Sequence, residues 1–144
     1  METKMDNGIP IFPAGVLKIY QNPNPPIIPD IDDFDYTKQG GGNPESTQFG
    51  SENPNIVDKS GLADLKVWFE ECIKDYFDNV MTLAYEEFWI HESWINKSRP
   101  NSAQSMHNHS NSLISGVYYI DSVPEHPPLI FEKVAYNADP FISL

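Results

Sequence analysis

Two histidines separated by one residue are the feature of this sequence best suited to chemistry. They are His107 and His109, in the stretch SMHNHSNS. If this stretch is a β-strand, residues i and i+2 project from the same face with Cα atoms about 6.6 Å apart. Two neutral imidazoles at that spacing can share one metal ion, and imidazole suits iron, zinc, copper and nickel alike. In an Asn- and Ser-rich stretch, the same pair is also compatible with two exposed polar residues.

A metal ion needs at least one more protein ligand, and the sequence offers several candidates without choosing among them. The other two histidines are His91 and His126. We expect His91, in an aromatic stretch, to be a hydrogen-bonded core residue, and His126, between prolines, to be exposed. The nearby carboxylates are Glu92, Asp121, Glu125 and Glu132. The sequence shows no Ser/His/Asp signature and no phosphate-binding glycine loop, which argues against acyl-transfer and nucleotide chemistry.

One amphipathic helix is predicted between Ser60 and Val80, where apolar residues recur at three- and four-residue steps. Ser60 is of a type that favours the N-cap position. The apolar residues of this pattern are Leu62, Leu65, Phe69, Cys72, Ile73, Tyr76 and Val80. We expect the helix to pack its apolar face against a sheet.

Short strands are predicted on both sides of this helix. Region 1–57 is rich in proline and carries the short apolar pieces Ile9–Phe12 and Val16–Tyr20, which suits one or two edge strands joined by loops. Region 85–144 is the predicted β core. Its candidate strands, rich in β-formers, are Glu86–Asn96, Gln104–Ser110, Leu113–Asp121 and Leu129–Val134. The pattern predicts a single, mainly β domain over residues 1–144, a sandwich or barrel with one buttressing helix.

Composition narrows the possible partners and compartment. Nine basic residues against 21 acidic ones give a formal net charge of -12, which disfavours nucleic acid because phosphates are neutralised by Lys and Arg. No apolar run reaches the roughly 18 residues that a membrane span needs. The single cysteine, Cys72, excludes an intrachain disulfide and a zinc site built from cysteines. Met1–Pro10 lacks the features of a secretory signal, so we expect a cytoplasmic protein.

Four sequence stretches together form a recognisable series of motifs: W-x-N, Q-x-x-H-x-H, S-G-V-Y-Y and L-x-F. They lie in Ser93–Asn96, Gln104–Ser112, Leu113–Ile120 and Pro128–Glu132. This series resembles a family of Fe(II)- and 2-oxoglutarate-dependent oxygenases found in bacteria and marine tailed phages. Weaker similarity extends to the N-terminal region and the predicted helix, so the resemblance covers nearly the whole chain.

The resemblance implies a double-stranded β-helix, the jelly-roll also seen in cupins, that binds Fe(II) and 2-oxoglutarate. It implies a dioxygenase that hydroxylates a C–H bond while 2-oxoglutarate is converted to succinate and CO2. His107 would be the first metal ligand, and His109 takes the place where related oxygenases have a carboxylate. Tyr119 would bind the small-molecule cosubstrate, because similar oxygenases have a tyrosine there that hydrogen-bonds 2-oxoglutarate. The primary substrate is not indicated.

The family's distal histidine and its 2-oxoglutarate-binding arginine belong to strands about 40 to 60 residues further along. No histidine follows His126, and the only arginine is Arg99. We therefore expect an incomplete jelly-roll, truncated at the C-terminus and inactive as a fragment. Unpaired strand edges would promote association, so we also expect homo-oligomers.

Two alternatives remain open from the residues alone. The first is a cupin-like metalloprotein, since His-X-His also opens a cupin motif, although Leu113 and Ile114 stand where cupins have a glutamate. The second is a non-enzymatic jelly-roll, serving as a structural or carbohydrate-binding phage module. Its candidate core or platform aromatics are Trp89, Trp94, Tyr118 and Tyr119. Retention of a metal would separate the first alternative from the second.

Overall fold

The computed structural model of the chain divides into two compact units, Met1–Ile19 with Asp121–Leu144, and Tyr20–Ile120. The structure describes residues 9–12, 15–25, 35–38, 48–51, 55–59, 61–98, 107–109, 111–120 and 128–131. In the first unit, β1 (Ile9–Phe12) pairs antiparallel with β2 (Gly15–Leu17). The register shifts between Pro10 and Phe12. These two strands lie where the N-terminal apolar pieces predict short strands.

The second unit contains one three-stranded antiparallel sheet in the order β3-β4-β5. Its strands are β3 (Tyr36–Lys38), β4 (Gln48–Ser51) and β5 (Asn96–Ser98). In the register, Thr37 pairs with Gly50, and Phe49 pairs with Lys97. The sheet therefore joins parts of the chain before and after the helix, although each strand is only three or four residues long.

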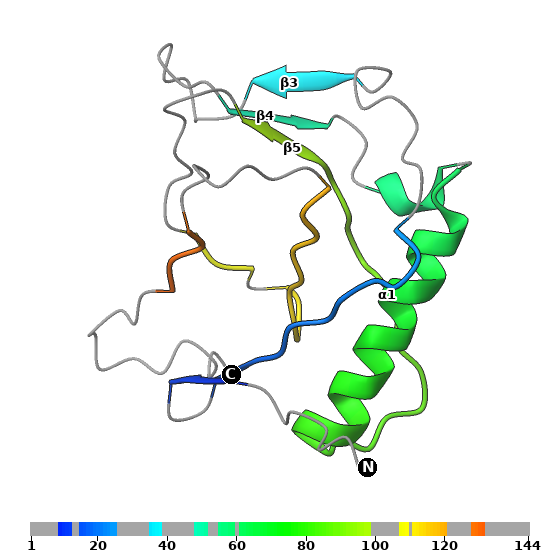
Figure 1. Cartoon of the computed structure of the whole chain (residues 1–144), viewed down its shortest axis with the longest axis vertical. Helices are drawn as coiled ribbons and strands as arrows, with labels where there is room; N and C mark the ends of the chain where they lie inside the picture. Colours follow the sequence, from blue (N-terminus) through cyan, green and yellow to red (C-terminus); the bar gives the residue numbers. More distant parts are fainter. Residues whose placement is uncertain are drawn as a thin grey trace. The chain divides into compact units, whose positions relative to one another are not determined.

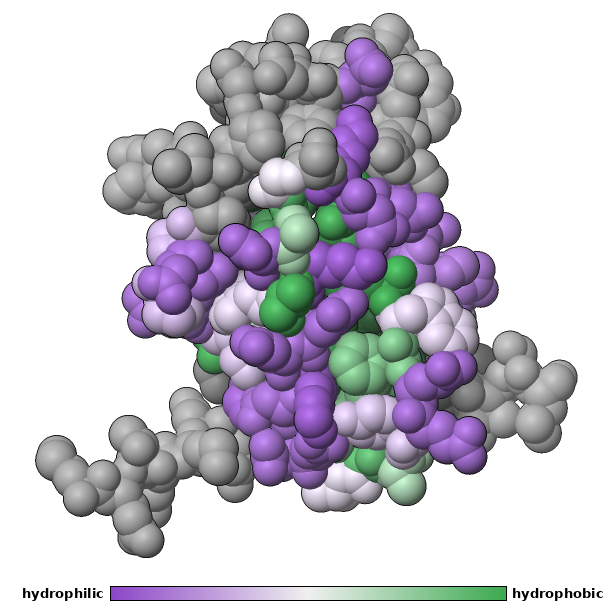
Figure 2. Space-filling view, turned by 90° about the vertical axis from the view of Figure 1, so that its right-hand side faces the viewer, coloured by the Kyte–Doolittle hydropathy of each residue, from purple (hydrophilic) through white to green (hydrophobic). Residues whose placement is uncertain are grey.

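The helix α1 spans Ala63–Tyr76 and continues as the π-helix η3, Phe77–Met81. Its cap position is Leu62 rather than Ser60, and no side chain supplies a capping hydrogen bond. Leu62 is only 2% exposed. Its backbone carbonyl accepts a hydrogen bond from the Lys66 N–H at 2.9 Å. The helix therefore begins with a buried apolar residue at its cap position. The outer side of α1, seen in Figure 2, is largely polar.

The core of the second unit lies at the N-terminal end of α1. It includes residues of the 3-10 helix η2 (Ile56–Asp58), of α1 and of the chain just before β5. The buried members are Ile56, Val57, Leu62, Leu65 and Ile95, with Trp68, Phe69, Ile90 and Tyr118 packed against them. This small apolar cluster is the centre to which the surrounding segments are attached.

After η3 the chain runs back along α1 toward β5 (Figure 1). Phe77 contacts Tyr85 and Phe88 edge to face, with ring centroids 5.2 and 5.5 Å apart, so aromatic contacts attach the returning segment to the helix end. Regular strand pairing begins at Asn96 rather than at Glu86. Side-chain packing on α1, rather than a strand ladder, organises most of this predicted strand.

The structure describes the remaining predicted strands only in part. Residues 107–109, 111–120 and 128–131 are described, and none of them is assigned to a strand. The rest of Gln104–Ser110 and Leu129–Val134 lies outside the described residues. The jelly-roll therefore stays a prediction. None of the helices in the described part of the chain has the length and apolar character that crossing a bilayer requires.

Candidate metal site

His107 and His109 lie close together in the second unit and are both exposed. Their ring centroids are 5.0 Å apart, and the ring planes meet at 77°. A metal–nitrogen bond of about 2.1 Å puts a ring centroid about 3.2 Å from the ion, so two adjacent ligands have centroids about 4.5 to 5.2 Å apart. The spacing of the two imidazoles therefore fits two ligands of one metal ion.

The described residues do not complete a ligand set. Within these residues, no group of three or more His, Cys, Asp or Glu side chains is placed to hold a metal ion. His91 is exposed, with its Nε2 atom 3.9 Å from Oε1 of Glu92. The expectation of a core histidine at position 91 is therefore wrong. The other candidates, His126, Asp121, Glu125 and Glu132, lie outside the described residues.

Trp94 contacts the histidine pair through the ring of His109. Its ring centroid lies 5.5 Å from that of His109, with 35° between the planes. Spacing within one segment could not predict this contact, because it joins residues fifteen positions apart in the chain. The one sequence signal that relates the two residues is the order of the W-x-N and H-x-H motifs.

Tyr118 and Tyr119 are neighbours in the chain but have different surroundings. Tyr118 is half-buried, with its ring 5.7 Å from Trp68 and 5.6 Å from Phe69. Tyr119 is 56% exposed. The residue predicted to bind cosubstrate is therefore open to solvent, whereas its neighbour is a packing residue.

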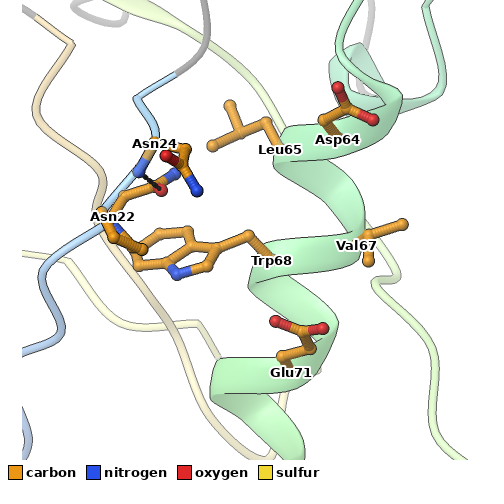
Figure 3. Close-up of a pocket in the computed structure, with 8 residues that line it drawn as sticks. Asn22, Asn24, Asp64, Leu65, Val67, Trp68 and Glu71 are labelled. Atoms are coloured by element: carbon orange, nitrogen blue, oxygen red, sulfur yellow. Dashed lines mark hydrogen bonds between the residues drawn. The ribbon is translucent and has the colours of Figure 1, made fainter.

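A separate groove of about 370 Å³ lies between α1 and the segment around Asn22. In Figure 3, Leu65, Trp68 and Glu71 project from the helix toward Asn22 and Asn24. The Asn24 N–H donates a hydrogen bond to the Asn22 side-chain oxygen at 2.9 Å.

The lining of this groove includes the carboxylates of Asp64 and Glu71 but no histidine. Two carboxylates would repel 2-oxoglutarate, which is a dianion at neutral pH, because like charges brought together are costly. The groove is therefore poorly suited to the cosubstrate, and it does not coincide with the histidine pair.

Comparison with known proteins agrees with the motif resemblance. Residues 92–138 match the model of a family described as "Putative 2OG-Fe(II) oxygenase". The matched segment contains Trp94, both histidines and Tyr119. No curated protein and no solved structure matches the chain.

The family match supports an oxygenase domain, an oxidoreductase class that uses Fe(II) and 2-oxoglutarate. The family alone carries that cofactor assignment. From the structure, the chain contributes a pair of imidazoles at suitable spacing.

Proposed function

We propose that this chain forms an Fe(II)- and 2-oxoglutarate-dependent dioxygenase domain in which His107 and His109 provide two metal ligands. The observation that carries the proposal is that the family match at residues 92–138 includes the two histidines, whose rings are 5.0 Å apart. When bound, Fe(II) would activate O2, which is the oxidant: one oxygen atom would enter the C–H bond of the substrate and the other would enter succinate as 2-oxoglutarate loses CO2.

Each histidine would offer the lone pair of one ring nitrogen. Because neutral imidazoles carry no charge, a pair of histidines leaves the full positive charge of the ion in place, whereas a carboxylate ligand would reduce it. That charge favours a dianionic chelator such as 2-oxoglutarate. The exposure of both rings leaves room for a small molecule to approach them from solvent.

Tyr119 would orient the cosubstrate by donating its phenolic O–H to a carboxylate. This role follows from its place in the S-G-V-Y-Y motif and from the exposure of its side chain. A hydrogen bond to a charged acceptor contributes about 1.5 to 3 kcal/mol. Loss of the hydroxyl alone should therefore weaken 2-oxoglutarate binding by about tenfold or more.

The test is anaerobic addition of Fe(II) and 2-oxoglutarate to the full chain, followed by visible absorption. We expect a weak charge-transfer band that His107→Ala abolishes. The matched control is His91→Ala, since His91 is also exposed but lies outside the pair of rings. Tyr119→Phe should shift the 2-oxoglutarate titration to higher concentration, whereas Tyr118→Phe, which keeps the packed ring, should not.

The outcomes distinguish the proposal from its alternatives. A retained metal ion without the 2-oxoglutarate band would favour a cupin-like metalloprotein. Failure to retain any metal, with His107→Ala and wild type behaving alike, would favour a non-enzymatic module. Either result contradicts the proposed dioxygenase.

A further inference from the structure

Three aromatic rings are in consecutive contact at the candidate metal site. The Trp94 ring centroid lies 5.5 Å from that of His109, and the His109 centroid lies 5.0 Å from that of His107. The planes of Trp94 and His109 are tilted by 35°, whereas the two histidines meet edge to face at 77°. The His109 ring therefore contacts both the indole and its partner ligand.

The backbone on both sides of Trp94 is fixed to the core. The Ser93 carbonyl accepts a hydrogen bond from the Ile56 N–H at 2.9 Å, and its hydroxyl oxygen accepts one from the Val57 N–H at 3.2 Å. On the other side, Ile95 is buried in the core cluster. The indole itself is 39% exposed, so it projects from a well-anchored backbone toward the surface.

The histidine segment has a different environment. Residues 107–109 are all exposed, and the His109 carbonyl accepts a hydrogen bond from the Ser112 N–H at 3.3 Å. That bond closes a turn within the segment itself and does not join it to the core. The contact with Trp94 therefore links the His109 ring to the fixed part of the second unit.

We infer that Trp94 is a positioning residue for the metal ligand His109, an inference that rests on the proposed function. An exposed imidazole loses rotamer freedom when it binds a metal ion, and a ring packed on an indole has already lost part of that freedom. Metal binding also makes the imidazole more positive, which strengthens its attraction to the π-electrons of a neighbouring indole within about 6 Å. Both effects raise metal affinity without any bond between Trp94 and the ion.

The test measures Co(II) binding to the full chain by calorimetry, with Co(II) standing in for the air-sensitive Fe(II). We expect Trp94→Leu to raise the Kd for Co(II) about threefold to tenfold, the size expected for the loss of one aromatic ring contact. Trp94→Phe, which keeps a ring, should recover most of the affinity. The matched control is Trp89→Leu. Because Trp89 is 70% exposed, we expect this variant to leave the Kd for Co(II) unchanged.

A second measurement tests the ring contact without any metal. In NMR spectra of the metal-free chain, the imidazole resonances of His109 should move in Trp94→Leu because the ring current of the indole is lost. They should stay in place in Trp89→Leu. If Trp94 had only a structural role, the His109 resonances would not move selectively in Trp94→Leu while Trp94→Phe recovered the affinity for Co(II). Trp94→Gln serves as a second variant without a ring should the leucine variant fail to fold.

The inference and the proposed function fail in different ways. If Trp94→Leu binds Co(II) as tightly as wild type while His109→Ala loses binding, the metal site stands and the role of Trp94 is refuted. If wild type does not bind Co(II), or His109→Ala binds it equally well, the metal site itself is refuted, and the role of Trp94 with it.

Discussion

The second unit contains two regions that are stabilised in different ways. Around the start of α1, five buried apolar side chains form a cluster, and two hydrogen bonds join η2 to Ser93, one to its carbonyl and one to its hydroxyl oxygen. Around the histidine pair, residues 107–109 are exposed, and the rings of Trp94, His109 and His107 are in consecutive contact. The first region gains its stability from burial. The second gains little, which leaves its polar side chains accessible to a ligand.

This difference suggests a division of roles between the two regions. Loops that carry binding residues are commonly positioned by a rigid scaffold to which they are attached at a few points. Here Trp94 connects the regions, because its neighbours Ser93 and Ile95 are fixed in the core region while its ring contacts His109. The comparison can be tested by substitutions whose effects on stability should differ widely.

The largest effect on stability is expected for Leu62→Ala. Leu62 is 2% exposed at the start of α1, and truncating a buried leucine costs about 2 to 5 kcal/mol in the free energy of unfolding. The matched control is Val67→Ala on the same helix, since Val67 is 54% exposed and should change stability by less than about 0.5 kcal/mol. Urea unfolding followed by circular dichroism measures both. Equal effects would show that the core region is not built around Leu62.

A smaller effect is expected for Tyr20→Phe, which tests how far the core region extends along α1. The Tyr20 hydroxyl donates a hydrogen bond to Oδ2 of Asp75 at 2.7 Å, joining the segment before Asn22 to the second half of the helix. Removing this hydroxyl should cost about 1.5 to 3 kcal/mol in the same unfolding experiment, because the acceptor is a charged carboxylate. No change in stability would mean that the two segments are held together by other contacts.

The same tyrosine should make stability depend on alkaline pH. Burial, together with the hydrogen bond and negative charge of Asp75, raises the pKa of Tyr20 far above its ordinary value of 10.0. The folded state therefore favours the protonated phenol. Its contribution to stability is fully present below pH 10 and is lost as the pH rises above 10, where the unfolded chain ionises first. Tyr20→Phe should lose less stability than wild type between pH 8 and pH 11.

The smallest effect is expected at the histidine pair. His107→Ala and His109→Ala should each change the free energy of unfolding of the metal-free chain by less than about 0.5 kcal/mol, because both side chains are exposed. Thermal unfolding without added metal measures this effect. A loss comparable to that of Leu62→Ala would contradict the division into a stabilising region and a binding region.

The positions of several elements could be predicted from local patterns. Apolar residues at three- and four-residue steps predict a helix over 60–80, and the structure has helical residues from Ala63 to Met81. The N-terminal strands also lie on the predicted apolar pieces. Such patterns are predictive because the apolar side chains of one helix or strand lie on one face. Their spacing along the chain is set by local backbone geometry alone.

Other features depend on which side chains are buried in the core, and local sequence patterns do not predict this. The helix cap is Leu62 rather than the predicted Ser60, and Leu62 is buried in the core cluster. The cap preference of serine is a local property, whereas burial of Leu62 depends on segments elsewhere in the chain. His91 is exposed despite its aromatic neighbours, because the adjacent Ile90 takes the place against the core.

The sequence by itself determined the His-X-His spacing, the motif order that matches the oxygenase family, and the amphipathic period of α1. The tertiary structure decided that Tyr118 packs on Trp68 while Tyr119 stays exposed, and that the Trp94 ring lies against His109. The physical reason is that spacing within a segment follows from backbone geometry, whereas contacts between segments depend on which side chains the core buries. Ile95 is buried, and the exposed Trp94 ring beside it contacts His109.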